Sequence, residues 1–189
     1  MADSYLALLG TKGGPSVRPK STMPTSSLLC LEGRLVVVDC GLGVTRGLVD
    51  QGMQLEALSL IFITHLHSDH YLELGPLIHT AWTTGLKTPV VVYGPAGLED
   101  YWQAFLTSMA ADIVLRIEDE GRVDLAGLVE FRTIEAGSVH QEEGLDVTAM
   151  RVVHPPIVDC FALRFAGAGR TVVMSGDTAY LPELAAFAR

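Results

Sequence analysis

The chain has 189 residues, a formal net charge of −9 and a pI near 5.0. Its mean hydropathy of +0.33 is high, yet no segment approaches the run of about 18 apolar residues that a membrane span needs. We therefore expect a protein without a membrane segment. The acidic balance also argues against the clustered Lys and Arg of a broad nucleic-acid-binding surface.

Strand and helix patterns alternate along the whole chain, with no repeat or linker, and predict a single α/β (α+β) domain over residues 1–189. The predicted strands are 5–9, 26–31, 35–38, 58–63, 89–93, 114–116, 128–135, 145–153, 161–165 and 170–175. The predicted helices are 44–51, 72–84, 96–110 and the terminal segment 181–189. The polar segment from Gly10 to Thr25 is expected to be an exposed connection.

The cysteines indicate the cellular compartment. Cys30, Cys40 and Cys160 are an odd number, have no C-x-x-C spacing and lie in apolar, strand-like surroundings. Such cysteines are typical of buried thiols in a reducing compartment. The N-terminal residues show neither a basic region nor a signal-peptide cleavage site, so we expect a cytoplasmic protein.

The most informative segment is Thr64-His65-Leu66-His67-Ser68-Asp69-His70, which follows the apolar strand predicted at 58–63. In an extended segment alternate side chains share a face, so His65 and His67 can converge on one point. A turn after His67 would aim Asp69 and His70 at a second point. Imidazoles with a carboxylate suit zinc, iron or manganese better than calcium or magnesium. The alternative, surface histidines in a loop, fits poorly with so dense a cluster in a chain with six histidines.

Two more candidate ligands follow predicted strands. His154 comes directly after the alternating run 145–153 and before Pro155-Pro156. Asp177 follows an apolar strand within Ser175-Gly176-Asp177-Thr178. A lone carboxylate in such a turn is more often a turn former or a helix cap, and only its position relative to the histidine cluster favours a ligand.

Together these segments resemble the metallo-β-lactamase superfamily of metal-dependent hydrolases, and more narrowly its branch of ribonuclease Z and arylsulfatase-like hydrolases. Leu8-Leu9-Gly10-Thr11 and Val38-Asp39-Cys40-Gly41 match the opening motifs of that branch. The resemblance covers essentially the whole chain. It implies a four-layer αββα sandwich of two mixed sheets face to face, with helices outside and metals at one end between the sheets.

The resemblance also implies a site for two zinc ions, although the same ligands accept iron or manganese. The implied ligands are His65, His67 and His154 for one ion, Asp69 and His70 for the second, and Asp177 bridging both. Two such ions hold a bridging hydroxide and stabilise the oxyanion that forms when it attacks. Asp69 would act catalytically by orienting the hydroxide or moving its proton. Asp39 would orient the metal loop, although it could instead cap its own turn.

The chain departs from the family pattern near its end. The family's second metal takes one more histidine well downstream of the Ser-Gly-Asp-Thr motif, whereas this chain ends twelve residues after Asp177. We therefore expect a domain incomplete at its C-terminus, without the last strand and helix. This would leave apolar residues uncovered around 181–187 and predicts a homodimer, domain swapping or poor solubility.

Glu73 and the remaining two histidines are expected to have other roles. Glu73 stands where relatives usually carry glycine, and we expect it to crowd the mouth of the pocket or add a carboxylate to it. His79, on the helix predicted at 72–84, and His140, in a predicted polar turn, are expected to be structural or exposed rather than ligands.

The predicted activity is hydrolysis by a dinuclear zinc enzyme of a small ester, sulfate, phosphodiester or lactone. Ribonuclease Z has a long arm between the motifs that correspond to His154 and Asp177, but here they lie only 23 residues apart. We therefore expect a small-molecule substrate, with nucleic acid unlikely and tRNA 3′-processing as the alternative. A second alternative is a truncated, catalytically inactive metal-binding domain.

Overall fold

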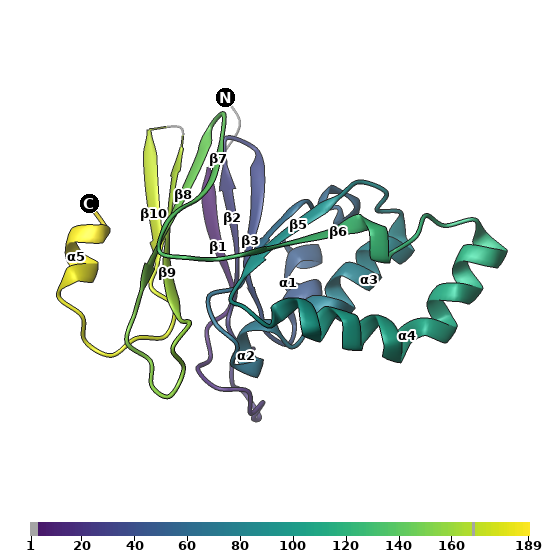
Figure 1. Cartoon of the computed structure of the whole chain (residues 1–189), viewed down its shortest axis with the longest axis horizontal. Helices are drawn as coiled ribbons and strands as arrows, with labels where there is room; N and C mark the ends of the chain where they lie inside the picture. The colour runs from purple at the N-terminus through teal and green to yellow at the C-terminus, as the bar shows by residue number, and fades with distance from the viewer. Residues whose placement is uncertain (1–3, 168) are drawn as a thin grey trace.

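The chain folds into two β-sheets that pack face to face (Figure 1). The first sheet has six strands in the order β1 (Tyr5–Gly10), β2 (Ser26–Leu31), β3 (Arg34–Cys40), β4 (Leu60–Phe62), β5 (Val90–Gly94) and β6 (Val129–Thr133). The second has the order β10 (Arg170–Met174), β9 (Phe161–Gly167), β8 (Leu145–Arg151) and β7 (Gly137–Glu142). This computed structural model describes residues 4–167 and 169–189.

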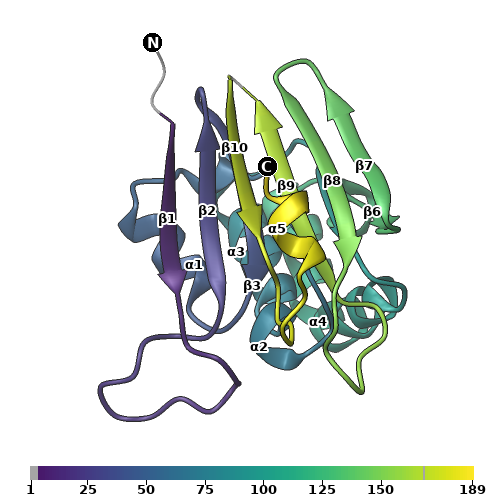
Figure 2. The same ribbon diagram turned by 90° about the vertical axis from the view of Figure 1, so that its left-hand side faces the viewer.

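Helices complete the outer layers. The first sheet is covered by α1 (Val44–Asp50), α3 (Leu74–Thr84) and α4 (Leu98–Glu120). Two short 3₁₀ helices, η1 (Leu55–Ala57) and η2 (Ala126–Leu128), and the single-turn α2 (Ser68–Tyr71) lie in connections. The last helix, α5 (Glu183–Phe187), lies outside the second sheet (Figure 2). The four layers confirm the predicted αββα sandwich.

Strand direction divides the six-stranded sheet into two parts. β1, β2 and β3 pair as antiparallel neighbours, whereas β3, β4, β5 and β6 pair as parallel neighbours. Parallel pairs need a crossover connection, and here the crossovers carry the helices of the outer layer. As a result, the carboxyl ends of β3, β4 and β5 all meet at the same end of the molecule, where polar side chains can gather.

Side-chain alternation in the central strand separates two cores. Ile61 of β4 points to the helices and packs with Trp82 of α3 and Trp102 of α4. Its neighbour Phe62 points to the other sheet, where its ring stacks on Tyr93 at a centroid distance of 4.7 Å and meets Phe165 edge-on at 5.3 Å. Because both faces of β4 are buried, the strand is an unbroken apolar run.

Two predictions about the elements are wrong. The strand predicted at 114–116 is part of α4, which continues to Glu120. Ion pairs one helical turn apart, Arg116 with Asp112 at 2.9 Å and Arg116 with Glu120 at 3.1 Å, fit this continuous helix. His140 lies in β7 and not in a turn, because the polar residues around it form the outer face of an edge strand.

The terminal segment also differs from expectation. Leu181, Leu184 and Phe187 are half-buried and pack on the outer face of the second sheet against Val152, Cys160 and Ala162. The apolar surface expected to be uncovered at 181–187 is therefore partly covered by the sheet. Within the described ranges, none of the helices combines the length and the apolar character that crossing a bilayer requires.

Candidate metal centre

The predicted ligands gather at the end of the sandwich that carries α2, the lower end in Figure 1. His65 and His67 follow β4, while Asp69 and His70 lie in α2. His154 follows β8 and Asp177 follows β10, so the second sheet contributes from the opposite wall. Three separate segments of the chain, namely 65–70, His154 and Asp177, thus converge on one place, as their positions after strand ends predict.

The first group of donors consists of three imidazoles. His67 Nδ1 lies 3.1 Å from His65 Nε2 and 3.0 Å from His154 Nε2. A tetrahedral zinc ion with Zn–N bonds of about 2.0–2.1 Å holds its nitrogens roughly 3.3–3.4 Å apart. The three nitrogens therefore have nearly the spacing that one tetrahedral ion requires. Burial, followed by the charges of His70, His67 and His154, lowers the pKa of His65 to about 3, so its ring is neutral.

The second group of donors shares His65 with the first. One donor atom each from His65, His70 and Asp177 lies within 4.8 Å of the others. Asp177 Oδ1 is 3.6 Å from His70 Nε2, and its Oδ2 is 3.8 Å from His154 Nε2. The two oxygens of one carboxylate thus face the two groups, which is the arrangement of a bridging ligand. Asp69 Oδ2 lies 3.7 Å from His70 Nε2.

His70 provides the test of whether a metal fits. Its Nδ1 lies 2.8 Å from Asp39 Oδ2, so Nδ1 carries the proton and donates it to the carboxylate. Its Nε2 is buried and has no hydrogen-bond partner within the described residues. A buried, unpartnered lone pair is costly unless a ligand such as a metal ion accepts it. The donor set therefore fits a divalent cation.

Asp39 holds this arrangement together. It is 3% exposed and accepts hydrogen bonds from Thr64 N at 2.8 Å and from Thr64 Oγ1 at 3.0 Å, besides the one from His70. Burial lowers the pKa of His70, but the hydrogen bond to Asp39 and the charges of Asp39, Asp177 and Asp69 outweigh this effect and leave the pKa raised. Asp39 was expected either to orient the metal loop or to cap its own turn, and these contacts agree with the first role.

Sequence reasoning missed two contacts that position the acidic ligands. The backbone N–H of Gly14 donates to Asp69 Oδ2 at 2.6 Å, so the connection between β1 and β2 reaches the centre. The Cys160 thiol donates to the backbone carbonyl of Asp177 at 3.2 Å. Burial and the nearby charge of Asp177 raise the pKa of Cys160 to about 12, so it remains a thiol donor. All three cysteines are buried, as predicted.

Glu73 was expected to crowd the mouth of the metal pocket or to add a carboxylate to it, but its carboxylate lies elsewhere. Its carboxylate accepts hydrogen bonds from Gly43 N and from Thr45 N, the second at 3.0 Å. It thereby caps the N-terminus of α1, where a negative charge is also favoured by the helix dipole. Glu73 thus joins α1 to the segment after the metal loop.

The remaining histidines lie away from the centre. His79 Nε2 is 2.9 Å from Asp112 Oδ2 and ties α3 to α4, which agrees with the structural role predicted for it. His140 is buried between the sheets. It belongs to neither donor group of the metal centre, and its position in a strand was not predicted.

Gly41 brings the loop after β3 into contact with the metal loop. A Cβ atom on Gly41 would lie 2.3 Å from the carbonyl oxygen of Asp69 and 2.8 Å from that of Thr25. We expect Gly41→Ala to displace Asp69 and to lower the free energy of unfolding by about 1–3 kcal/mol. Urea denaturation would measure the loss of stability. Gly52→Ala is not a suitable control because of its positive φ, whereas Gly13→Ala adds a Cβ in open space and should cost far less.

Comparison with known proteins places the chain in a family. The family model described as "Anti-Pycsar protein Apyc1" matches residues 5–189. The chain belongs to the Apyc1 family. A ribonuclease Z of Mycobacterium marinum is 32% identical to this Apyc1-family chain over 182 residues, which are 95% of the chain and 64% of the relative.

Solved structures share the fold of this Apyc1-family chain. Human tRNase Z, short form, superposes with a TM-score of 0.72 at 23% identity, covering 97% of this chain and 73% of that one. The metallo-β-lactamase fold protein YhfI of Bacillus subtilis superposes with a TM-score of 0.70 at 20% identity, covering 96% of this chain and 66% of that one. The resemblance to the metallo-β-lactamase superfamily of metal-dependent hydrolases is confirmed.

One expectation is overturned by these relatives. A small-molecule substrate was expected and nucleic acid was not, because only 23 residues separate His154 from Asp177, too few for the ribonuclease Z arm, and because the net charge is −9. The curated relative is a ribonuclease, an enzyme that acts on RNA. Net charge is a poor guide here because the field at a metal centre is local and depends on the bound ions. The Apyc1-family chain spans 64% of that relative's length.

Proposed function

We propose that this chain forms the metal centre of a dinuclear, zinc-dependent hydrolase that cleaves phosphodiester bonds. One observation carries the proposal: two donor groups share His65 and are joined by the two oxygens of Asp177. Paired metal sites of this kind serve phosphodiester cleavage in many nucleases and phosphatases. Of the substrate classes that the sequence left open, the phosphodiester is favoured because ribonucleases break this bond.

The ligand roles follow from the hydrogen bonds. His65, His67 and His154 would hold one ion, and Asp69, His70 and Asp177 would complete the second position. Thr64 Oγ1 lies 3.1 Å from His65 Nδ1, so the proton of His65 sits on Nδ1 and its Nε2 lone pair faces the centre. When bound, the two ions would act as Lewis acids that activate water and stabilise negative charge on the phosphoryl group.

Asp69 has a second role in the proposal. The Gly14 N–H fixes the position of its Oδ2, which leaves Oδ1 to accept a proton from the attacking water. Its burial keeps the carboxylate in one orientation. The Gly14 loop would thereby act as a positioning element for the catalytic carboxylate.

The decisive experiment combines elemental mass spectrometry with a hydrolysis panel on the purified chain. The substrates are bis(p-nitrophenyl) phosphate, a short RNA, p-nitrophenyl acetate and p-nitrophenyl sulfate, each with and without added zinc. We expect about two metal ions per chain and zinc-dependent cleavage of the phosphodiesters. Cleavage of only the acetate or the sulfate would refute the substrate class. A fully loaded chain without turnover would mean an inactive metal-binding domain.

Metal removal should also lower stability. An ion that binds only the folded state at 100 times its dissociation constant adds about 2.7 kcal/mol to the free energy of unfolding. For a chain of this size that corresponds to a fall in melting temperature of roughly 5–10 °C on chelation. Differential scanning calorimetry before and after dialysis against a chelator would measure it. An unchanged melting temperature would contradict tight binding at His65 and His70.

A further inference from the structure

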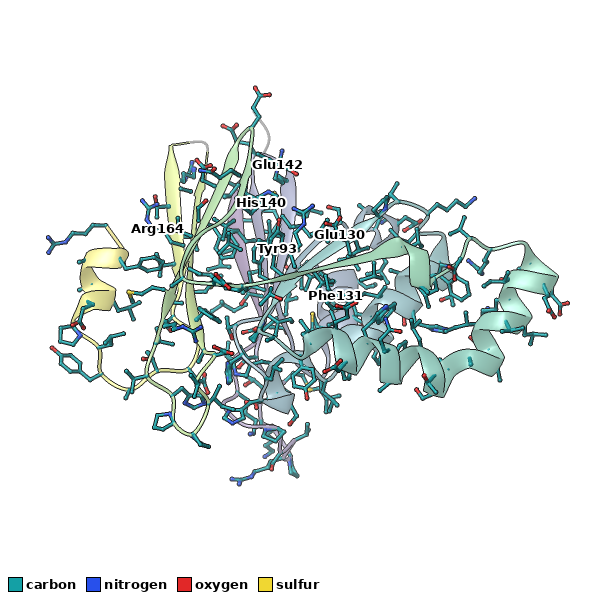
Figure 3. All side chains as sticks on the ribbon, viewed as in Figure 1. Tyr93, Glu130, Phe131, His140, Glu142 and Arg164 are labelled. Atoms are coloured by element: carbon teal, nitrogen blue, oxygen red, sulfur yellow. The ribbon has the colours of Figure 1, made fainter. Side chains whose placement is uncertain are left out.

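A second cavity lies at the opposite end of the sandwich from the metal centre. It has a volume of about 280 Å³ and lies between the two sheets, lined by residues of β3, β4, β5 and β6 on one side and of β7 on the other. Arg34 begins β3 and Leu60 begins β4, and both line this cavity. Asp39 and His65, at the metal centre, lie at the other ends of the same strands. Figure 3 shows His140 and Glu142 toward the upper end, away from the α2 end.

The cavity contains a buried donor with no acceptor. Arg132 Nη1 donates to Tyr93 Oη at 2.7 Å, and the Tyr93 hydroxyl lies 2.9 Å from His140 Nδ1. The hydroxyl therefore donates its proton to Nδ1, and the proton of the neutral imidazole lies on Nε2. Burial lowers the pKa of His140, in keeping with a neutral ring.

His140 Nε2 has no hydrogen-bond partner in the described part of the chain, although its side chain is only 5% exposed. The carboxylate of Glu142 is 3.7 Å away, beyond hydrogen-bond distance. An unsatisfied buried donor costs stability, and such exceptions in native structures call for a ligand or an ordered water. The lining of the cavity thus places a hydrogen-bond donor, His140 Nε2–H, beside a hydrogen-bond acceptor, the Glu142 carboxylate.

The charges of the lining do not favour a simple anion. Arg34 Nη1 pairs with Glu142 Oε2 at 2.7 Å, and Arg132 Nε pairs with Glu130 Oε1 at 2.7 Å. Each guanidinium is therefore neutralised and held in place by a carboxylate. The remaining walls come from the apolar residues Leu60, Pro89 and Val91 and from Ser59. Fixed guanidinium planes and apolar walls suit a flat, uncharged ring.

We propose that this cavity is a second ligand site that binds a nucleobase of a free nucleoside. A ring or carbonyl acceptor of the base would take the hydrogen bond of His140 Nε2–H, and the adjacent N–H of the base would donate to Glu142. The guanidinium groups of Arg34 and Arg132 would stack on the ring. The volume of about 280 Å³ lies just below the usual range of ligand pockets, about 300–1,000 Å³, which suits a nucleoside better than a longer chain.

The test is a titration of the full chain, labelled with ¹⁵N-histidine, with the four common nucleosides and with inorganic phosphate. We expect at least one nucleoside to shift the His140 Nε2 resonance, and phosphate to leave it unchanged. Each ligand is raised to roughly 10 mM, which fills a site with a dissociation constant of about 1 mM to nine tenths. No shift with any nucleoside would overturn the proposal. A shift with phosphate alone would also overturn it and would indicate an oxyanion site.

Two neighbouring glutamates offer a matched pair of variants. Glu142→Leu removes the acceptor, and because this side chain is 60% exposed the fold should persist. Glu143→Leu makes the same change at an exposed residue that does not line the cavity. We expect Glu142→Leu to weaken nucleoside binding about tenfold or more, because a hydrogen bond to a charged group is lost, and Glu143→Leu to leave it unchanged. Equal effects in both variants would refute the site.

Discussion

Replacing His67 with alanine is expected to lower the rate of phosphodiester hydrolysis at least about a thousandfold, which is roughly 4 kcal/mol of transition-state stabilisation. His67 Nδ1 is the atom that lies near both other nitrogens of its group, at 3.1 Å from His65 and 3.0 Å from His154. Without it only two imidazoles remain, and the first ion would be held weakly. The measurement is kcat/KM for bis(p-nitrophenyl) phosphate, with the metal content of the same sample.

His79→Ala is the matched control for His67→Ala. It removes the same kind of side chain from α3 and costs a hydrogen bond to Asp112 that lies away from the centre. We expect its kcat/KM to stay within about twofold of the parent chain, since His79 belongs to neither donor group and one lost hydrogen bond costs only about 1 kcal/mol of stability. Full turnover in the His67→Ala variant would show that the proposed first ion is not needed for hydrolysis. A loss in both variants would point to unfolding, which circular dichroism would detect.

The location of the candidate site was predictable because its ligands follow strand ends. His65, His154 and Asp177 each come directly after an apolar or alternating run, and such runs end at an edge of a sheet. The turn between the strands predicted at 26–31 and 35–38 was equally predictable, because Glu32 and Gly33 lie between two apolar runs. In the structure these two residues have the positive φ values of 48° and 86° that a tight turn needs. In these places the local pattern and the fold agree, so short-range reasoning sufficed.

The failures arose where distant contacts decide the outcome. Gly14 looked like part of an exposed loop, and nothing in its neighbours reveals the hydrogen bond to Asp69, 55 positions away. His140 sits in a polar run that resembles a turn, yet pairing with β8 makes it a strand and turns this one side chain inward. The partners of Glu73, at Gly43 and Thr45, belong to another helix. Such partners become visible only in three dimensions.

Replacing Asp39 with asparagine is expected to weaken binding of the second metal ion about 10- to 100-fold, the usual effect of losing a group that orients a ligand. Asparagine keeps the shape of the side chain and tolerates the positive φ of 61° at this position. However, asparagine has an NH₂ group, which is a hydrogen-bond donor, in place of one carboxylate oxygen. Thr64 and His70 both donate to the Asp39 carboxylate and therefore need acceptors there. One of these hydrogen bonds must therefore be lost, and His70 is freed to turn.

The two donor groups should respond differently to Asp39→Asn. Asp39 contacts His70 but makes no hydrogen bond to His67 or His154 within the described residues, so the first ion should stay bound. Competition with a chelator would resolve the two affinities, and metal content should fall from about two ions per chain to about one. Asp146→Asn, at an exposed position of β8, is the matched control and should retain both ions. Equal weakening of both ions would mean that Asp39 supports the whole centre and not His70 alone.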